Sequence, residues 1–278
     1  MNRITKKKQL TPVTTLFEVD APMVARKARP GQFVVVRISE KGERIPLTIA
    51  DFDRERGTVT IVVQEVGKTT REMARLREGD EILDFLGPLG QPAELLTGGR
   101  VICVGGGFGV APVLPIAKAL NQRGVEVISV IGARTKDLLI LEEELRAVSK
   151  EFHVATDDGS RGHKGLVTEV LKMLLDRGQP VDRVVAIGPM VMMRAVAEVT
   201  RPYGVKTLVS VDPIMVDGTG MCGCCRVTVD GKVRFACVDG PIFDAHQVDF
   251  NEAVRRGRIY APEQKLALER CTSCGGEG

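Results

Sequence analysis

The pattern of hydrophobic and polar positions changes character twice along the chain. Up to about residue 97, short apolar and β-branched runs alternate with polar positions and are separated by Gly and Pro turns. Strands are expected at 13–19, 32–37, 45–49, 57–63 and 81–85, with one helix at 69–76 whose first threonine can cap it. The pattern predicts a small antiparallel β-barrel over residues 1–97, with the basic stretch 1–8 as a solvated start to its first strand.

From about residue 98 the period lengthens, and apolar strands alternate with helices. Strands are expected at 100–104, 126–131, 152–156, 183–187 and 206–210, and helices at 138–149, 165–176, 190–202 and in a segment ending near 123. This alternation predicts an α/β nucleotide-binding domain over residues 98–212, with a parallel sheet covered on both faces. Ligands bind such sheets at the carboxyl ends of the strands.

Beyond residue 212 the pattern is irregular. A cysteine-rich stretch predicts a metal-cluster subdomain over residues 213–250, and a polar tail occupies residues 251–278. The helix expected at 264–270 buries little by itself, so we expect the tail to dock on a partner subunit. Cys271 and Cys274 have C-x2-C spacing without a second pair, which fits a flexible thiol-bearing tail or half of a metal site completed by a partner.

Composition excludes several classes of protein. The 278 residues are 44% hydrophobic and 27% charged, as is typical of a soluble globular protein, and no run approaches the roughly 20 apolar residues of a membrane span. The net charge of +3 is too small to indicate nucleic-acid binding. The basic N-terminus is followed by no apolar signal core, so we expect a cytoplasmic protein without disulfides.

Four of the seven cysteines lie between residues 222 and 237. With Asp217 taken as a ligand, the spacing through Cys222, Cys225 and Cys237 is D-x4-C-x2-C-x11-C. This is the order of a plant-type [2Fe-2S] site with its first cysteine replaced by aspartate. Glycines within the loop let its backbone fold around a cluster. The spacing predicts that these four residues hold a [2Fe-2S] cluster.

Cys224 competes as a ligand within the same loop. Adjacent residues of an irregular loop usually project in different directions, so Cys224 and Cys225 are not expected to share one centre. Cys224 is therefore expected to be a free thiol. The alternatives are a zinc site of four cysteines and buried thiols without a metal.

Two groups of residues in the barrel region suit anionic ligands. In the first, a guanidinium and a hydroxyl on one strand suit a pyrophosphate and the edge of a flavin ring. In the second, the N–H groups that open the expected helix form an anion site. An exposed strand arginine and a capped helix are the ordinary alternatives. The groups are Arg44, Pro46, Leu47 and Thr48, and Gly67, Lys68, Thr69 and Thr70.

A glycine-rich turn joins the first strand of the α/β domain to its helix, and phosphates can approach such a backbone closely. Pro112 suits the first turn of that helix. Counted from Gly105, the last glycine of G-x-G-x-x-G falls on Val110, so this is not the standard dinucleotide fingerprint. The candidate residues are Gly105, Gly106, Gly107, Gly109, Ala111 and Pro112.

Two acidic residues, Asp157 and Asp158, follow the strand expected at 152–156. A carboxylate there accepts hydrogen bonds from ribose hydroxyls and repels a 2'-phosphate, which favours NAD over NADP. A helix N-cap loop is the alternative. Arg134 and Arg161 leave NADP open.

In the order of these motifs the chain resembles the ferredoxin-NADP reductase superfamily. The resemblance rests on residues 30–33, 44–48, 67–70 and 87–90, on the glycine-rich turn ending in Ala-Pro, and on Gly188, Pro189 and Met192. It implies FAD contacts at residues 44–48 and 67–70 and nicotinamide-nucleotide contacts at the turn and at residues 188–192. Ile187 stands where plant-type reductases have a cysteine, so no thiol role is implied there.

With the cluster loop added, residues 5–250 resemble two groups of electron-transfer subunits. One is that of class 1B dihydroorotate dehydrogenase, which normally carries cysteine where Asp217 stands. The other comprises the small subunits of NADH-dependent ferredoxin:NADP oxidoreductases, also called sulfide dehydrogenase beta subunits, and Asp217 favours it.

The second resemblance implies an NAD(P)H-dependent flavoprotein oxidoreductase subunit that moves electrons between NAD(H), FAD and a [2Fe-2S] cluster. The cofactors carry the chemistry, so no catalytic acid, base or nucleophile is expected. A larger subunit with flavin and iron-sulfur centres would complete a heterodimer that exchanges electrons with ferredoxin, with electron bifurcation as an extension. The alternatives are dihydroorotate oxidation and a zinc-stabilised module without a flavin.

Overall fold

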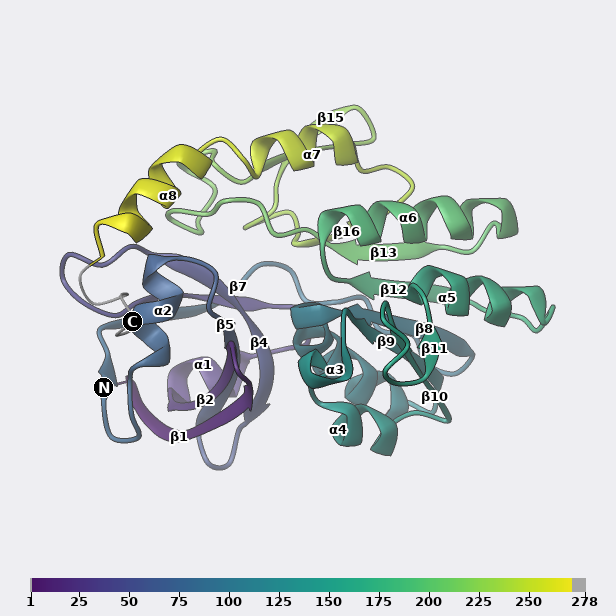
Figure 1. Cartoon of the computed structure of the whole chain (residues 1–278), viewed down its shortest axis with the longest axis horizontal. Coiled ribbons are helices and arrows are strands. Elements are labelled where there is room, and N and C mark those ends of the chain that lie inside the picture. The colour runs from purple at the N-terminus through teal and green to yellow at the C-terminus, as the bar shows by residue number, and fades with distance from the viewer. Residues whose placement is uncertain (1, 272–278) are drawn as a thin grey trace.

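The first lobe of the computed structural model, which describes residues 2–271, is a curled antiparallel sheet (Figure 1). Its strands follow the order β6-β1-β2-β5-β4-β3-β7 and form a near-closed barrel. Helices α1 (Pro22–Lys27) and α2 (Lys68–Ala74) lie against it. The strands are β1 (Asn2–Thr11), β2 (Thr14–Asp20), β3 (Phe33–Arg37), β4 (Ile45–Asp53), β5 (Thr58–Gln64), β6 (Glu81–Ile82) and β7 (Asp84–Leu89).

The barrel forms because alternate residues of its strands turn apolar side chains inward. Phe17, Ile49 and Ile61 are fully buried in this core. The basic N-terminus is more than a solvated start to the next strand, because Asn2–Thr11 is itself a ten-residue strand paired with β2. Its lysines face outward while Ile4 is buried, so charge on one face does not prevent pairing.

The second lobe is a seven-stranded sheet in the order β11-β10-β9-β8-β12-β13-β16. Helices α3 (Val110–Asn121) and α4 (Glu142–Ala147) cover one face, and α5 (Val167–Asp176) and α6 (Met190–Thr200) cover the other (Figure 1). The strands are β8 (Arg100–Gly106), β9 (Glu126–Ala133), β10 (Glu151–Thr156), β11 (His163–Lys164), β12 (Arg183–Ile187), β13 (Thr207–Ser210) and β16 (Ile242–Asp244).

This sheet is mixed and not wholly parallel, because its last strand comes from the cysteine-rich region. β16 pairs antiparallel with β13, with Val209 opposite Phe243. The cysteine-rich region is therefore joined to the α/β lobe through backbone hydrogen bonds. The domain boundaries at residues 97, 212 and 250 stay predictions.

The remaining C-terminal elements lie along one side of the molecule (Figure 1). β14 (Arg226–Val229) and β15 (Lys232–Phe235) form a hairpin, followed by α7 (Phe250–Arg256) and α8 (Ala261–Glu269). Helix α8 lies against α2 of the barrel. No residue of α8 is buried, as expected for a helix of its composition.

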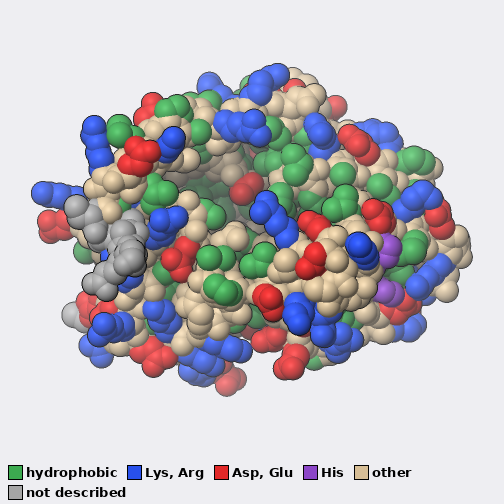
Figure 2. Space-filling view, viewed as in Figure 1, with side chains coloured by type: hydrophobic (Ala, Val, Ile, Leu, Met, Phe, Trp, Pro, Cys, Tyr) green, Lys and Arg blue, Asp and Glu red, His purple; other side chains and the backbone are tan. Residues whose placement is uncertain are grey.

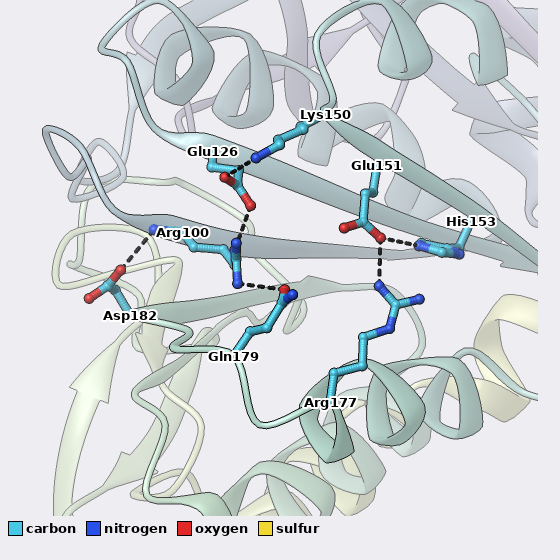
Figure 3. A network of polar contacts seen from close by, with 8 residues as sticks. All are labelled: Arg100, Glu126, Lys150, Glu151, His153, Arg177, Gln179 and Asp182. Atoms are coloured by element: carbon cyan, nitrogen blue, oxygen red, sulfur yellow. Dashed lines mark hydrogen bonds and ion pairs between the residues drawn. The ribbon is translucent and has the colours of Figure 1, made fainter.

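A polar network ties together the starting ends of three parallel strands (Figure 3). Glu126 accepts from Arg100 and Lys150 at 2.5 Å each, and Glu151 accepts from Arg177 at 2.7 Å. These cations hold the pKa of both carboxyls below the usual range. The network occupies the amino-terminal edge of the sheet, which leaves the opposite edge for ligands.

Among residues 2–271, none of the helices combines the length and the apolar character that crossing a membrane demands.

Candidate cofactor sites

Neighbouring strands β8 and β12 form the point where the sheet order reverses. The chain continues from β8 to β9 and β10 on one side, and from β12 to β13 on the other. Gly105 at the end of β8 lies opposite Ile187 at the end of β12. Ligands of open α/β sheets bind in the crevice at such a switch point, beyond the carboxyl ends of the strands.

The glycine-rich turn is packed against the end of β12 so closely that side chains are excluded. A Cβ on Gly109 would overlap the carbonyl oxygen of Ile187, and one on Gly106 would overlap the sulfur of Met192. Gly188 and Pro189 complete this contact, since Met192 Cε would lie 2.8 Å from a Cβ on Gly188. The structure thus brings together two predicted groups that are about 80 residues apart in the sequence.

Gly107 differs from its neighbours because it faces open space. It has a φ of +54°, and nothing lies within 4 Å of a Cβ placed on it. Ala111 and Pro112 are buried in the first turn of α3, so they position the helix and are covered by protein. The backbone at Gly107 and the N–H groups of the helix start are the parts of the turn that can meet a phosphate.

Asp157 and Asp158 lie just beyond the carboxyl end of β10, as predicted. Asp158 Oδ1 accepts from the backbone N and the Oγ of Ser160 at 2.9 and 2.6 Å, and these bonds lower the pKa of Asp158. Both aspartates are exposed, but the carboxylate of Asp158 is engaged in shaping the turn. The structure does not support the helix-cap alternative, because α5 begins after Leu166 without a side-chain cap.

The residues of the first barrel group, at positions 44–48, point to two different faces of β4. Arg44 directly precedes the strand; its guanidinium is 44% exposed and lies 3.5 Å from the Asp84 carboxylate. Leu47 points into the barrel core, so it can meet a ligand only through its backbone. Pro46 and Thr48 lie on the opposite face, half-buried, where side-chain contact with a flavin is open.

The second barrel group opens α2, with Gly67 as the residue before its first turn. Thr70 Oγ1 accepts from the backbone N of Gly67 at 3.0 Å, and Thr69 donates to Glu43 at 2.6 Å. Both threonine side chains are thus engaged within the protein. Intrahelical bonding begins with Arg71 N to Gly67 O, so earlier N–H groups are left to face an anion. The ammonium of Lys68 lies 3.3 Å from the Glu72 carboxylate within the same helix.

The four predicted cluster ligands form two pairs. The sulfur atoms of Cys225 and Cys237 lie 3.2 Å apart, and the Asp217 carboxylate accepts from the backbone N of Cys222 at 3.0 Å. Two thiolates on one tetrahedral iron are separated by a similar distance, about 3.7 Å for metal–sulfur bonds near 2.3 Å. Two pairs fit a cluster of two irons. No three His, Cys, Asp or Glu side chains of residues 2–271 converge on a single metal position.

The electrostatics of the loop differ between the two pairs. The backbone N–H groups of Thr219 and Cys222 lower the pKa of Asp217, and a bond from the backbone of Cys224 lowers that of Cys222. Burial raises the pKa of Cys237 to about 12. The backbone thus favours the anionic forms of Asp217 and Cys222, whereas burial favours the protonated thiol of Cys237, whose proton a bound metal would displace.

The cluster loop packs on the barrel, which explains two of its glycines. A Cβ on Gly218, at φ +75°, would come within 2.9 Å of the Leu89 side chain, and one on Gly220 within 3.1 Å of Val238. The loop therefore lies between the barrel and the β14–β15 hairpin. Figure 2 shows a hollow in this face of the molecule, between the barrel and the α/β lobe.

Sequence reasoning missed one residue at this site. Arg256 ends α7, and its Nη2 donates to the carbonyl oxygen of Cys224 at 3.2 Å. Its Nε is buried without a hydrogen-bond partner among the described residues. A basic residue in the last turn of a helix is commonplace, so the sequence held no signal for this contact beyond the run Arg255-Arg256.

The tail contacts the chain's own barrel. Cys271 is buried, and its sulfur lies 3.8 Å from Oε1 of Glu72 in α2. Cys271 is disulfide-bonded, so the expectation of a protein without disulfides is wrong at this position. Cys274 lies outside the described residues.

Two family models match the chain. One, described as the iron-sulfur cluster binding domain of dihydroorotate dehydrogenase B, covers residues 212–249, and the other, an oxidoreductase NAD-binding domain, covers residues 103–198. The first spans all four predicted cluster ligands, and the second spans the glycine-rich turn, Asp157 and the Gly188-Pro189 element.

Whole-chain comparisons extend these matches. The chain is 48% identical to the "Dihydroorotate dehydrogenase B (NAD(+)), electron transfer subunit homolog" of Thermotoga maritima, over 100% of this chain and 98% of that one. It is 40% identical to the electron transfer subunit of dihydroorotate dehydrogenase B from Bacillus caldolyticus, over 81% of this chain and 89% of the relative.

A solved structure of the NADH-dependent reduced ferredoxin-NADP oxidoreductase, described for flavin-based electron bifurcation, contains a chain with 48% identity and a TM-score of 0.92. The match covers 97% of both chains. The two chains thus share their fold over nearly their whole length. The chain belongs to the family of electron transfer subunits that includes those of dihydroorotate dehydrogenase B, with the fold of the ferredoxin-NADP reductases.

Proposed function

We propose that this protein is the flavin and iron-sulfur subunit of an NADH-dependent ferredoxin:NADP oxidoreductase. In that role it moves electrons between NAD(H), FAD and a [2Fe-2S] cluster. The observation that carries the proposal is the match in fold and sequence to a chain of such an enzyme, which extends through the barrel, the α/β lobe and the cluster loop.

The residues of this chain bind and orient, and the cofactors react. When bound, the nicotinamide delivers a hydride, the flavin divides its electron pair, and the cluster carries single electrons. Gly107 and the start of α3 would hold the dinucleotide phosphates, and Asp157 a ribose hydroxyl. Gly188 and Pro189 would border the nicotinamide, close to the turn they already touch.

In the barrel, the exposed guanidinium of Arg44 and the N–H groups opening α2 would hold the FAD pyrophosphate. Pro46, Thr48 and the backbone of Leu47 would border the flavin ring. Asp217, Cys222, Cys225 and Cys237 would bind the cluster, two ligands to each iron. The hollow of Figure 2 adjoins both lobes, as a route for electrons between nucleotide and cluster requires.

A partner subunit follows from the family, since its members are subunits of larger enzymes. We infer a larger partner carrying its own flavin and iron-sulfur centres, which would supply the route to ferredoxin. The loop offers it a contact surface, because Met221 is 88% exposed beside Cys222. Electron bifurcation would then be a property of the assembly.

A second candidate function is electron transfer for dihydroorotate oxidation. It is favoured by relatives of that name at 37–40% identity and by the family model over the cluster region. Asp217 distinguishes the two candidates at the sequence level, and the partner chain distinguishes them in practice.

The deciding experiment is anaerobic purification of the native complex, with flavin, iron and sulfide analysis and identification of the co-purifying chain. In addition to the flavin and iron of the partner, we expect FAD and two irons per chain of this protein, and activity with NADH, NADPH and ferredoxin. Dihydroorotate-dependent reduction of NAD would establish the second candidate. A colourless protein that contains zinc would overturn both.

A further inference from the structure

We propose that Arg256 is a positioning residue of the iron-sulfur site, which fixes the backbone carbonyl of Cys224 and places a half-buried positive charge against the cluster loop. The inference rests on the proposed cluster site. By this proposal, α7 helps to set the reduction potential of the cluster, although the helix contains none of the cysteines whose spacing predicts the site.

Helix α7 is held firmly enough to aim this side chain. Phe250 and Ala253 are buried in the same core as Cys225 and Cys237. Asp249 caps the helix by accepting from the backbone N of Glu252 at 2.9 Å, and Glu252 accepts from the backbone N of Thr228 in β14 at 3.2 Å. The helix is thus fixed to the strand that continues directly from the cysteine loop.

The guanidinium of Arg256 crosses from α7 to that loop. Nη2 donates to the carbonyl oxygen of Cys224, which lies between the predicted ligands Cys222 and Cys225. The carbonyl of Cys224 belongs to the peptide unit that continues into the predicted ligand Cys225, so this bond restrains the backbone directly before Cys225. The N–H of the same residue, Cys224, is bonded to the sulfur of Cys222. Arg256 therefore acts on a ligand through the backbone, without touching the ligand itself.

The second observation is the buried Nε–H without a partner. An unpartnered buried donor on a charged group is costly in free energy, so a native structure rarely keeps one without a compensating charge nearby. No ion pair among the described residues includes Arg256. A [2Fe-2S] cluster with four anionic ligands is itself an anion, and it would supply that compensation.

Comparison with the neighbouring Arg255 distinguishes this role of Arg256 from that of an ordinary positive charge at a helix end. Both arginines lie in the last turn of α7, where a positive charge favours the helix dipole. Arg255 is exposed, whereas Arg256 is half-buried and bonded to another segment. A helix-end role requires neither the burial nor the bond to Cys224.

The effect on the cluster has a defined sign. Reduction adds one negative charge to the cluster, and a nearby positive charge in a poorly solvated position stabilises the reduced form more than the oxidised form. Arg256 would therefore raise the reduction potential and favour acceptance of an electron from the flavin. Its removal would lower the potential.

The test compares wild type with Arg256→Gln, Arg256→Lys and Arg255→Gln in the anaerobically purified complex. Iron and sulfide content, the electron paramagnetic resonance spectrum of the reduced cluster, and the midpoint potentials of cluster and flavin are measured for each. We expect a more negative cluster potential in Arg256→Gln, a potential closer to wild type in Arg256→Lys, and wild-type values in Arg255→Gln. The flavin potential should not move.

The outcomes separate this inference from the proposed function. A wild-type protein without iron would overturn the proposed function itself. Full iron content with the wild-type potential in Arg256→Gln would overturn the inference alone. If Arg256→Gln loses its iron, restored iron in Arg256→Lys supports a role for the charge, and loss in both with retention in Arg255→Gln shows that the side chain serves packing.

Discussion

Gly109 lies so close to Ile187 that a single added methyl group would overlap the Ile187 carbonyl oxygen. This contact joins the glycine-rich turn to the end of β12 and sets the width of the crevice at the switch point. It makes the glycine a requirement of backbone packing, independent of any ligand.

We expect Gly109→Ala to destabilise the protein by about 1–3 kcal/mol, because the turn must move away from β12. The shift would also weaken NADH binding. Thermal unfolding and NADH titration check both effects. Gly107→Asn is the matched control for stability, because that position is open and asparagine tolerates a positive φ. Equal unfolding temperatures for wild type and Gly109→Ala would contradict the packing argument.

Asp217→Cys should retain a [2Fe-2S] centre with an altered spectrum and potential, because thiolate and carboxylate donate differently to iron. Absorption and electron paramagnetic resonance spectra of the anaerobic protein check this. Asp217→Ala should lose or weaken the cluster, whereas Cys224→Ala should keep it. The reverse pair of results would assign the site to four cysteines.

Asp157→Ala should reduce the preference for NADH over NADPH on the order of ten- to a hundredfold, as expected for loss of a charge-assisted hydrogen bond of about 1.5–3 kcal/mol. The ratio of kcat/KM for the two nucleotides is the readout. Asp137→Ala, an exposed acidic residue of the preceding βα connection, serves as the control. An unchanged ratio in Asp157→Ala would remove this residue from the ribose site.

The network of Figure 3 predicts a dependence of stability on pH. Lys150 and Arg100 lower the pKa of Glu126 below its usual 4.5, so the folded protein binds this proton less readily than the unfolded chain. The contribution to stability is present above pH 4.5 and is lost as the pH falls through the lowered pKa. The effect is small and weakened by salt, because the carboxylate is partly accessible to solvent.

Unfolding temperatures measured between pH 7 and pH 3 therefore should fall less steeply in Glu126→Gln than in wild type. Glu143→Gln, an exposed carboxyl outside the network, should follow the wild-type curve. Identical curves for all three proteins would show that the network adds nothing measurable.

Much of the fold follows from the sequence because strong periodicity sets local structure. The apolar run 183–187 predicts β12 with its observed bounds, and the strand expected at 45–49 is the first half of β4. β16 has three residues and β11 has two, too few to show a pattern of their own, so these strands are defined by pairing with β13 and β10. The lysines of β1 interrupt the alternation of apolar and polar residues, so the sequence alone does not predict this strand.

For the candidate sites too, local sequence predicts some features, and long-range packing determines the others. Spacing along the chain predicts which four residues hold the cluster, and the structure places these residues as two pairs. Residues that act across the fold are invisible to such spacing: Arg256 reaches the loop from a helix 32 positions later, and Leu47 turns into the core although its neighbours do not. Which side of a strand a residue faces depends on the register of pairing.

The pairing of β16 with β13 also bears on how the chain can be divided. A fragment that ends before residue 242 would leave the backbone of Thr207–Ser210 as a bare sheet edge, and such edges recruit other copies into aggregates. The iron-sulfur segment therefore closes the nucleotide-binding sheet as well as carrying the cluster. Deletion of that segment should yield an insoluble protein, and no independent NAD-binding module.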